Sequence, residues 1–281
     1  MPLNCQDNYQ QWRDDKLRHY QTNLNNCIVE IKNPLALTKN EQTKLKDIVK
    51  YNNFAIYQTN IKEENLRTSL VVLNKQLGLV DYDQHLFAKT SGLSYIEKTD
   101  NKKQEEFIPY TNKKINWHTD GYYNSPQQRI RAMTLHCVHP ADIGGINQWI
   151  DYEIVYILLK EQNPEIIKIL MNQQAMTIPA FEKREQSQGP IFYFDDKTKQ
   201  LMMRYTQRKK NVIWLDNSEM LMAKQALDTL LDSKTDYHFE YKMSSGDGFV
   251  CNNILHNRDA FQDGKNNKRL MIRGRYFNRL L

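Results

Sequence analysis

The chain has 281 residues, 40% hydrophobic and 26% charged, and its 39 basic and 33 acidic residues give a formal net charge of +6. This composition is typical of one ordinary globular protein and excludes collagen-like, coiled-coil and low-complexity architectures. No apolar run approaches the roughly 18 to 20 residues that a membrane span requires, and the polar start of the chain is unlike a signal peptide. We therefore expect a cytoplasmic protein that does not bind membranes.

The positive charge does not by itself indicate a nucleic-acid partner. Basic and acidic residues are mixed along the chain, and the basic clusters Lys113-Lys114 and Arg208-Lys209-Lys210 are short. Solvated surface is the better interpretation, so we expect no nucleic-acid partner. The four cysteines are widely spaced and form no C-x-x-C pair, which favours reduced, mostly buried thiols.

The first half of the chain alternates helix and strand. Thr38 and Glu41 form a capping-box pattern at a helix start, and an apolar segment at 53–57 has the length of a strand. Leucines at helical spacing predict a second helix over 64–77, with Gly78 as its C-cap. The polar, lysine-rich stretch 94–114 is expected to be a surface segment.

Strand-length segments dominate the second half. They are 131–138, a strand that follows the Gly144-Gly145 turn and runs through Trp149, and 237–243, 248–252 and 269–277. Helix-start signals at Asp151 and at Asn163-Pro164, and a third helix over 218–231, interrupt them. The sequence therefore predicts a mainly β core with flanking helices. Because no long linker divides the chain, we expect one domain over 1–281, with a helical insert at about 151–231.

His118 and Asp120 lie two positions apart, so on an extended strand both side chains point to one face and can bind one metal ion. The pattern is weak evidence alone, because the segment 238–240 (His-Phe-Glu) has the same spacing. That segment lies inside an expected regular strand without a nearby glycine turn, which favours a structural role. His136 and His139 are three apart, which on a strand places them on opposite faces, so we expect core or surface histidines.

A second candidate element follows near the C-terminus. A turn, a strand at 248–252 and His256 at the far end of that strand precede Arg269 and Arg273, which share one face of the last expected strand. Two histidines and one carboxylate leave three positions open on Fe(II), enough for a bidentate 2-oxoacid and O2. An arginine further out would bind the remote carboxylate of the oxoacid.

These residues resemble the taurine dioxygenase-like (TauD/TfdA) Fe(II)/2-oxoglutarate oxygenases of the clavaminate synthase-like superfamily. The order and spacing of the motifs fit that family: 116–121 (NWHTDG), Pro140, Gly144-Gly145, Trp149, Gly246-Asp247, Asn253, 256–261 (HNRDAF) and 269–273. They cover about 114–278, whereas the first hundred residues match only in their rhythm of strands and helices. The resemblance implies a cupin-like double-stranded β-helix, or jelly-roll, core at 111–281, with the N-terminal residues 1–110 packed on it.

The resemblance also implies site residues. His118, Asp120 and His256 would bind Fe(II) at the catalytic centre, and Arg269 would hold the C5 carboxylate of the cosubstrate 2-oxoglutarate. Arg273 takes a family position that contacts substrate or cosubstrate. Asn147 stands where relatives often have the Thr of Gly-Gly-Asp-Thr; its amide replaces the hydroxyl and can still donate to a carboxylate.

The implied reaction is hydroxylation of an unactivated C–H of a small molecule, with O2 consumed and succinate and CO2 released. The substrate class that the resemblance implies is an amino acid-like or other polar metabolite. The carboxylate of Asp120 favours hydroxylation, desaturation or ring closure over halogenation, since halogenating relatives lack it.

Three alternatives stay open. The chain could be a non-catalytic metal- or 2-oxoglutarate-binding sensor or scaffold, or an oxygenase acting on a macromolecule. A Zn(II) hydrolase with the same ligands would leave Arg269 and Arg273 unexplained. Other basic residues suggest an anionic group on the substrate, namely Arg129, Arg131, Arg204 and Arg208. The oligomeric state cannot be read from the pattern.

Overall fold

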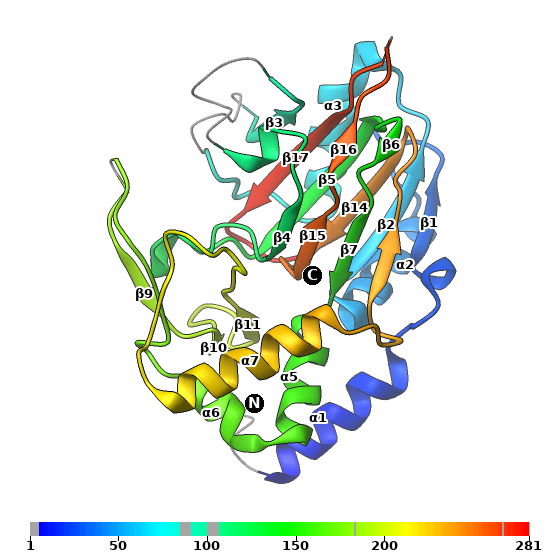
Figure 1. Ribbon diagram of the computed structural model, residues 1–281. Coiled ribbons are helices and arrows are strands. Elements are labelled where there is room, and N and C mark those ends of the chain that lie inside the picture. Colours follow the sequence, from blue (N-terminus) through cyan, green and yellow to red (C-terminus); the bar gives the residue numbers. More distant parts are fainter. Residues whose placement is uncertain (1–5, 85–90, 100–106, 183, 266, 281) are drawn as a thin grey trace.

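The computed structural model describes residues 6–84, 91–99, 107–182, 184–265 and 267–280 (Figure 1). Two β-sheets face each other at its centre. The major sheet is ordered β1 (Ile28–Ile31), β2 (Phe54–Thr59), β14 (Asp247–Cys251), β5 (Ala132–His139), β17 (Leu270–Tyr276) and β3 (Leu93–Ile96). The minor sheet is ordered β13 (Phe239–Tyr241), β7 (Asn147–Ile150), β15 (Leu255–Arg258) and β4 (Ile115–His118). All neighbouring strands in them are antiparallel except β1 and β2, and the two sheets form a jelly-roll core.

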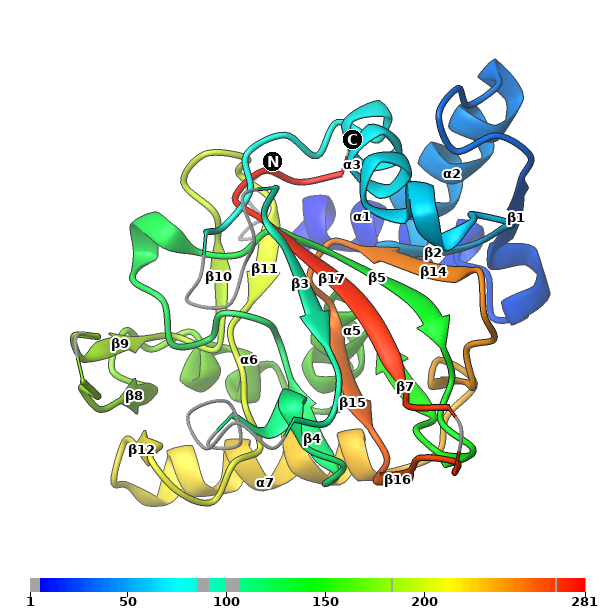
Figure 2. The same ribbon diagram turned by 90° about the horizontal axis from the view of Figure 1, so that it is seen from above.

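Two helices, α2 (Lys39–Asn52) and α3 (Leu66–Gln76), cover the outer face of the major sheet (Figure 2). The expected capping box starts α2, because Thr38 and Glu41 bond reciprocally across the first turn. Gly78 follows the last turn of α3 with φ +80°, a conformation that glycine adopts without steric cost. Their buried leucines pack onto residues of β2 and β14, which confirms both predicted helices.

The remaining helices close one end of the two sheets (Figure 1): α1 (Gln6–His19), α5 (Tyr152–Gln162), α6 (Pro164–Leu170) and α7 (Ser218–Asp232). The side chains of Asp151 and Asn163 cap α5 and α6, as their sequence positions predict. The expected insert at about 151–231 is only partly helical. It also contains β8 (Met176–Ile178), β9 (Ser187–Gly189), β10 (Phe192–Phe194), β11 (Leu201–Met203) and β12 (Ile213–Trp214). No helix in the described ranges is long and apolar enough to cross a membrane.

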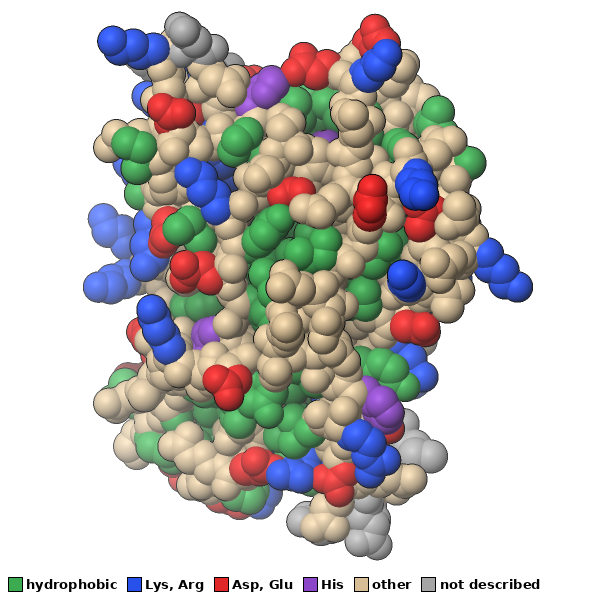
Figure 3. Space-filling model, turned by 90° about the vertical axis from the view of Figure 1, so that its right-hand side faces the viewer, with side chains coloured by type: hydrophobic (Ala, Val, Ile, Leu, Met, Phe, Trp, Pro, Cys, Tyr) green, Lys and Arg blue, Asp and Glu red, His purple; other side chains and the backbone are tan. Residues whose placement is uncertain are grey.

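The space between the sheets is filled with aromatic and aliphatic side chains. Phe54, Trp149, Phe239 and Phe249 form a cluster with ring centroids 4.8 to 6.1 Å apart, in which β2 and β14 of one sheet meet β7 and β13 of the other. This packing ties the sheets together and fixes the positions of the strand ends that carry the site. On the face shown in Figure 3, basic and acidic side chains are interspersed, in agreement with the interpretation of the net charge.

The structure corrects two expectations about local structure. His256 does not end the strand at 248–252: β14 ends at Cys251, the chain crosses to the other sheet, and His256 lies in β15. The stretch 94–114 is not only surface, because Ser94 is buried in β3 and Tyr110 is buried next to the site; residues 100–106 lie outside the described ranges.

A separate pair of short strands extends the core at the end away from the helices. β6 (Ile143–Gly144) pairs with β16 (Phe261–Gln262), and Gly144 has φ +70°. A Cβ on Gly144 would lie 2.3 Å from the carbonyl oxygen of Ala260, so only glycine fits this close approach. The predicted turn at Gly144-Gly145 is thereby confirmed.

The cysteines behave as expected where they are described. Cys27, Cys137 and Cys251 are buried and form no disulfide. Burial raises the pKa of each thiol to about 12, so they are unreactive at neutral pH. Cys5 lies outside the described residues.

Candidate active site

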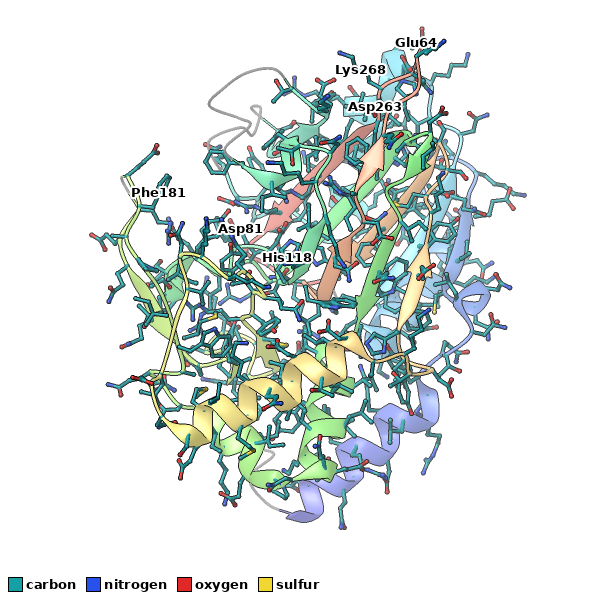
Figure 4. All side chains as sticks on the ribbon, in the orientation of Figure 1. Glu64, Asp81, His118, Phe181, Asp263 and Lys268 are labelled. Atoms are coloured by element: carbon teal, nitrogen blue, oxygen red, sulfur yellow. The ribbon has the colours of Figure 1, made fainter. Side chains whose placement is uncertain are left out.

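Three of the predicted residues converge at one end of the minor sheet. His118 ends β4 and lies directly opposite His256 of β15 in the strand register, with the ring centroids 4.2 Å apart. Asp120 follows two residues after His118, and its Oδ1 is 3.8 Å from His118 Nε2. One potential ligand atom from each residue lies within 4.8 Å of the other two. Figure 4 shows His118 in the interior, at the inner end of β4.

Both imidazoles are held in the same way by the main chain. His118 Nδ1 is 2.9 Å from the carbonyl oxygen of Asn116, and His256 Nδ1 is 2.9 Å from that of Ile254. A carbonyl can only accept, so each Nδ1 carries the proton and each Nε2 keeps its lone pair for the site. Burial lowers the pKa of His118 to about 3 and also lowers that of His256, so both rings are neutral at physiological pH.

Asp120 supplies the negative charge of the group. Its side chain is 5% exposed, and burial alone would raise its pKa. The cations Arg273 and Arg275 outweigh this effect and hold the pKa of the Asp120 carboxyl well below its usual range. Arg273 Nη1 lies 3.3 Å from Oδ1 and 3.2 Å from Oδ2 of Asp120. Asp120 is therefore ionised at neutral pH.

The donor set fits a divalent transition metal. Two neutral imidazole nitrogens and one carboxylate are the donor set that would hold non-haem Fe(II). Within the described residues, this is the group of three side chains placed to hold a metal ion. The similarly spaced His238 and Glu240 do not belong to this metal site. His238 bonds to Thr235, and Glu240 accepts a hydrogen bond from Gln148.

Arg269 lies just before β17 and is 4% exposed. Its guanidinium stacks over the ring of Phe261 at 5.0 Å, and its Nη1 has no hydrogen-bond partner among the described residues. Burial lowers the pKa of Arg269 to about 10. A buried guanidinium with an unpaired edge is suited to an anionic ligand, because a carboxylate would supply the missing charge and acceptors.

Arg273 lies in β17, whereas Arg269 immediately precedes this strand. Four residues of strand separate their Cα atoms by roughly 13 Å. Arg273 lies beside Asp120, whereas the main-chain N–H of Arg269 donates to Asp263, which Figure 4 places at the far end of the sheet from His118.

Asn147 lies at the start of β7, next to β15. It borders a small internal cavity of about 20 Å³ between the sheets, and His256 borders the same cavity. The other lining residues are apolar or aromatic: Ile56, Met133, Leu135, Trp149, Tyr241, Met243 and Phe249. The Asn147 amide makes one long contact, 3.4 Å from Nδ2 to the carbonyl oxygen of Gly145, so it remains available to a ligand.

Several arginines that the sequence offered as anion ligands have structural partners. Arg131 is buried and pairs with Asp195, and Arg204 donates to the main-chain carbonyls of Tyr122, Met176, Ser187 and Gly189. Arg129 stacks over Tyr193, and Arg208 donates to the hydroxyl of Tyr122. Arg131 and Arg204 are therefore corrected to structural residues, because their donors are already satisfied.

Arg258 also has a structural role. It donates to the carbonyl oxygens of Thr111 and Lys113 and stacks over Phe261. His136 bonds to the hydroxyl of Tyr57, and His139 pairs with Glu63, which confirms that neither belongs to the site.

Two supports of the site come from segments that are distant from it in the sequence. The N–H of Thr119 donates to the carbonyl oxygen of Tyr205, and the N–H of Tyr205 donates to Thr119 Oγ1. With the isolated β-bridge between His118 and Thr206, these bonds pair the insert with the metal-ligand segment. Asn253 bonds to the main chain of Asp120. The Asn252-Asn253 pair indicates a turn, but not its target.

A jelly-roll core with two neutral histidines and an ionised aspartate at one end of its minor sheet is typical of non-haem metal oxygenases. The sequence matches the family described as "Taurine catabolism dioxygenase TauD, TfdA family" over residues 68–275, and the chain belongs to this family of dioxygenases. No curated protein sequence matches it.

Solved structures with similar folds include oxygenases of low sequence identity. Asparagine oxygenase in complex with Fe(II), 2S,3S-3-hydroxyasparagine and succinate has a TM-score of 0.64 at 12% identity, over 84% of this chain and 78% of that one. The non-haem iron oxygenase OrfP in complex with Fe and alpha-ketoglutaric acid has a TM-score of 0.63 at 15% identity, over 85% and 80%. PvcB from Pseudomonas aeruginosa has a TM-score of 0.61 at 14% identity, over 89% and 85%.

Proposed function

We propose that this dioxygenase uses Fe(II) and 2-oxoglutarate, with His118, Asp120 and His256 as the iron ligands. The observation that carries the proposal is the convergence of these three side chains within 4.8 Å, with both Nε2 lone pairs free. The bound iron would activate O2 with 2-oxoglutarate as reductant, so that succinate and CO2 leave and one oxygen atom enters a substrate C–H bond.

The residues around His118, Asp120 and His256 orient these side chains before metal or cosubstrate binds. The carbonyls of Asn116 and Ile254 fix the tautomer and the plane of each ring, which raises ligand basicity and prevents rotation. The apolar wall formed by Met133, Leu135 and Phe249 offers water few hydrogen-bond partners in the space beside His256. Exclusion of water strengthens the electrostatic contacts inside the site.

We assign the C5 carboxylate of 2-oxoglutarate to Arg269, because this guanidinium is buried and has an unpaired Nη1. Asn147 borders the cavity beside His256 and donates to the oxoacid. Arg273 lies next to Asp120, where it binds a carboxylate of the cosubstrate or of the substrate. All three residues are donors, which matches an acceptor-rich dicarboxylate.

The substrate that best fits this arrangement is a small polar molecule with a carboxylate, such as an amino acid. The complexes of asparagine oxygenase with 3-hydroxyasparagine and of a mutant of OrfP with (3S)-hydroxy-L-Arg support this class. The reaction that we propose on it is hydroxylation of an unactivated C–H.

An anaerobic titration tests the metal and the cosubstrate together. Apoprotein is titrated with Fe(II) and then with 2-oxoglutarate, and the weak visible charge-transfer band of the chelate is recorded. We expect the band in the wild-type protein, weakened iron binding in Asp120→Ala, and iron binding with a weakened band in Arg269→Met. A folded wild-type protein that binds iron and gives no band would overturn the assignment of 2-oxoglutarate.

The substrate class is tested by succinate release. A panel of free amino acids is compared with the corresponding amines, which lack the carboxylate. Faster succinate release with amino acids, together with a product 16 mass units heavier, supports the proposal. Equal rates with amines would remove the carboxylate from the recognised group.

A further inference from the structure

Asn253 lies in the turn that carries the chain from β14 in the major sheet to β15 in the minor sheet. It is 2% exposed and has a left-handed backbone with φ +53°. Asparagine is enriched in this region because its short polar side chain bonds to nearby main chain. The residue therefore accepts an unusual conformation while its side chain points into the protein.

The side-chain amide of Asn253 makes three hydrogen bonds to the main chain of two residues that are distant in sequence. Its Oδ1 accepts from the N–H of Asp120 at 2.7 Å, and its Nδ2 donates to the carbonyl oxygen of Asp120 at 2.9 Å. The same Nδ2 donates to the carbonyl oxygen of Ile130 at 2.7 Å. One amide thus binds both main-chain polar groups of Asp120.

These bonds replace a strand partner that Asp120 lacks. β4 ends at His118, so the main chain of Asp120 has left the ladder, yet the residue is buried and its polar groups need partners. Asp120 and Ile130 lie at the two ends of the connection from β4 to β5. Asn253 therefore fixes both ends of this connection, three residues before His256.

We propose that Asn253 is a positioning residue. It holds the Asp120 carboxylate where this group can bind the same divalent metal ion as the two histidine Nε2 atoms, and so sets the affinity of the site for that ion. This inference rests on the proposed function, since it takes the three side chains to be metal ligands. Residues that orient ligands without touching the metal typically change its affinity by about 10- to 100-fold.

Asn252 provides a matched control. It has the same residue type and the same 2% exposure, and it lies in the same turn. Its Nδ2 donates to Asn53 Oδ1 at 3.1 Å, and its Oδ1 accepts from the N–H of Leu280 at 3.0 Å. Its bonds hold α2 and the C-terminal segment rather than Asp120, so it reports the cost of losing a buried asparagine at this turn.

The test measures Co(II) binding to purified apoprotein by the visible absorption of the bound ion, with thermal unfolding of each metal-free protein as the fold control. Asn253→Gly is the first variant, because glycine adopts φ +53° without strain and only the side chain is lost. Asn252→Gly is its control. Asn253→Asp is the second variant, because it keeps the bond from Asp120 N–H and loses both donors to carbonyls.

We expect Asn253→Gly and Asn253→Asp to bind Co(II) about 10- to 100-fold more weakly than wild type, with an altered absorption spectrum. Asn252→Gly should unfold at a lower temperature and keep its Co(II) affinity within about twofold. Equal losses of affinity in the Asn252 and Asn253 variants, or unchanged affinity in folded Asn253→Asp, would overturn the positioning role alone. A wild-type protein that binds neither Co(II) nor Fe(II) would overturn the proposed function itself.

Discussion

Arg269 offers a test in which ligand binding and stability change in opposite directions. Its guanidinium is buried, its Nη1 is unpaired, and burial lowers its pKa from 12.5 to about 10. At 1.36 kcal/mol per pKa unit, that shift corresponds to about 3 kcal/mol against the charged form. The free protein therefore holds a cation that destabilises it.

Arg269→Met should remove this cost and fill most of the same volume. Loss of the stacking on Phe261 offsets about 1 kcal/mol, so we expect a net stabilisation of about 1 to 2 kcal/mol. In a chain of this size that corresponds to a rise in Tm of roughly 2 to 6 °C. Binding of 2-oxoglutarate should weaken, since truncating one member of a buried charge pair costs about 2 to 5 kcal/mol, or roughly 30- to 5,000-fold.

The assay is thermal unfolding of the iron-loaded anaerobic protein with and without 2-oxoglutarate, with the affinity measured by the charge-transfer band. Arg131→Met is the matched control, because Arg131 is buried to a similar degree and has a carboxylate partner in Asp195. This control should lose about 3 to 5 kcal/mol of stability, since it leaves Asp195 buried and unpaired. A lower Tm for Arg269→Met with unchanged 2-oxoglutarate affinity would refute the reasoning.

Three further predictions concern stability. Gly248→Ala should destabilise the protein by about 2 to 4 kcal/mol in chemical denaturation, because its new Cβ would lie 1.8 Å from the ring of Tyr57; a smaller loss would mean that the ring moves aside. Lys16→Met should cost about 3 to 5 kcal/mol in the same assay, since it leaves Asp151 and a second buried carboxylate without their cation, and a neutral outcome would contradict this. Burial lowers the pKa of His136 to about 4, so between about pH 6.5 and pH 4 this imidazole is protonated in the unfolded chain and neutral in the folded protein. The free energy of unfolding therefore falls as the pH drops from about 6.5 towards 4. Between pH 7.5 and 5.0 the wild type should lose about 2 kcal/mol more than His136→Gln, and parallel pH profiles would count against this cause.

Local signals in the sequence determined the elements that depend on neighbouring residues. The Thr38–Glu41 capping box, the side-chain caps at Asp151 and Asn163 and the glycine after α3 act within a few residues, so the chain itself carries the information. His118 and Asp120 are close in sequence, but Asp120 follows the end of β4, so its bonds to Asn253 rather than strand spacing hold it in place.

The sequence was less informative where contacts join distant segments. The strand pairing that places His256 opposite His118 requires the chain to change sheets after Cys251, and the local pattern indicates a turn there but not a change of sheet. The short strands of the insert likewise depend on partners far along the chain.

The roles of the buried cations were decided by the tertiary structure alone. The sequence does not distinguish Arg131 from Arg269. In the structure Arg131 pairs with the carboxylate of Asp195, whereas Nη1 of Arg269 has no hydrogen-bond partner among the described residues. Asn252 and Asn253 are adjacent, yet one holds the C-terminal segment and the other the main chain of Asp120. Residue type fixes which bonds a side chain can make, whereas packing of distant segments decides which partner it meets, and at this site that choice separates structural support from binding.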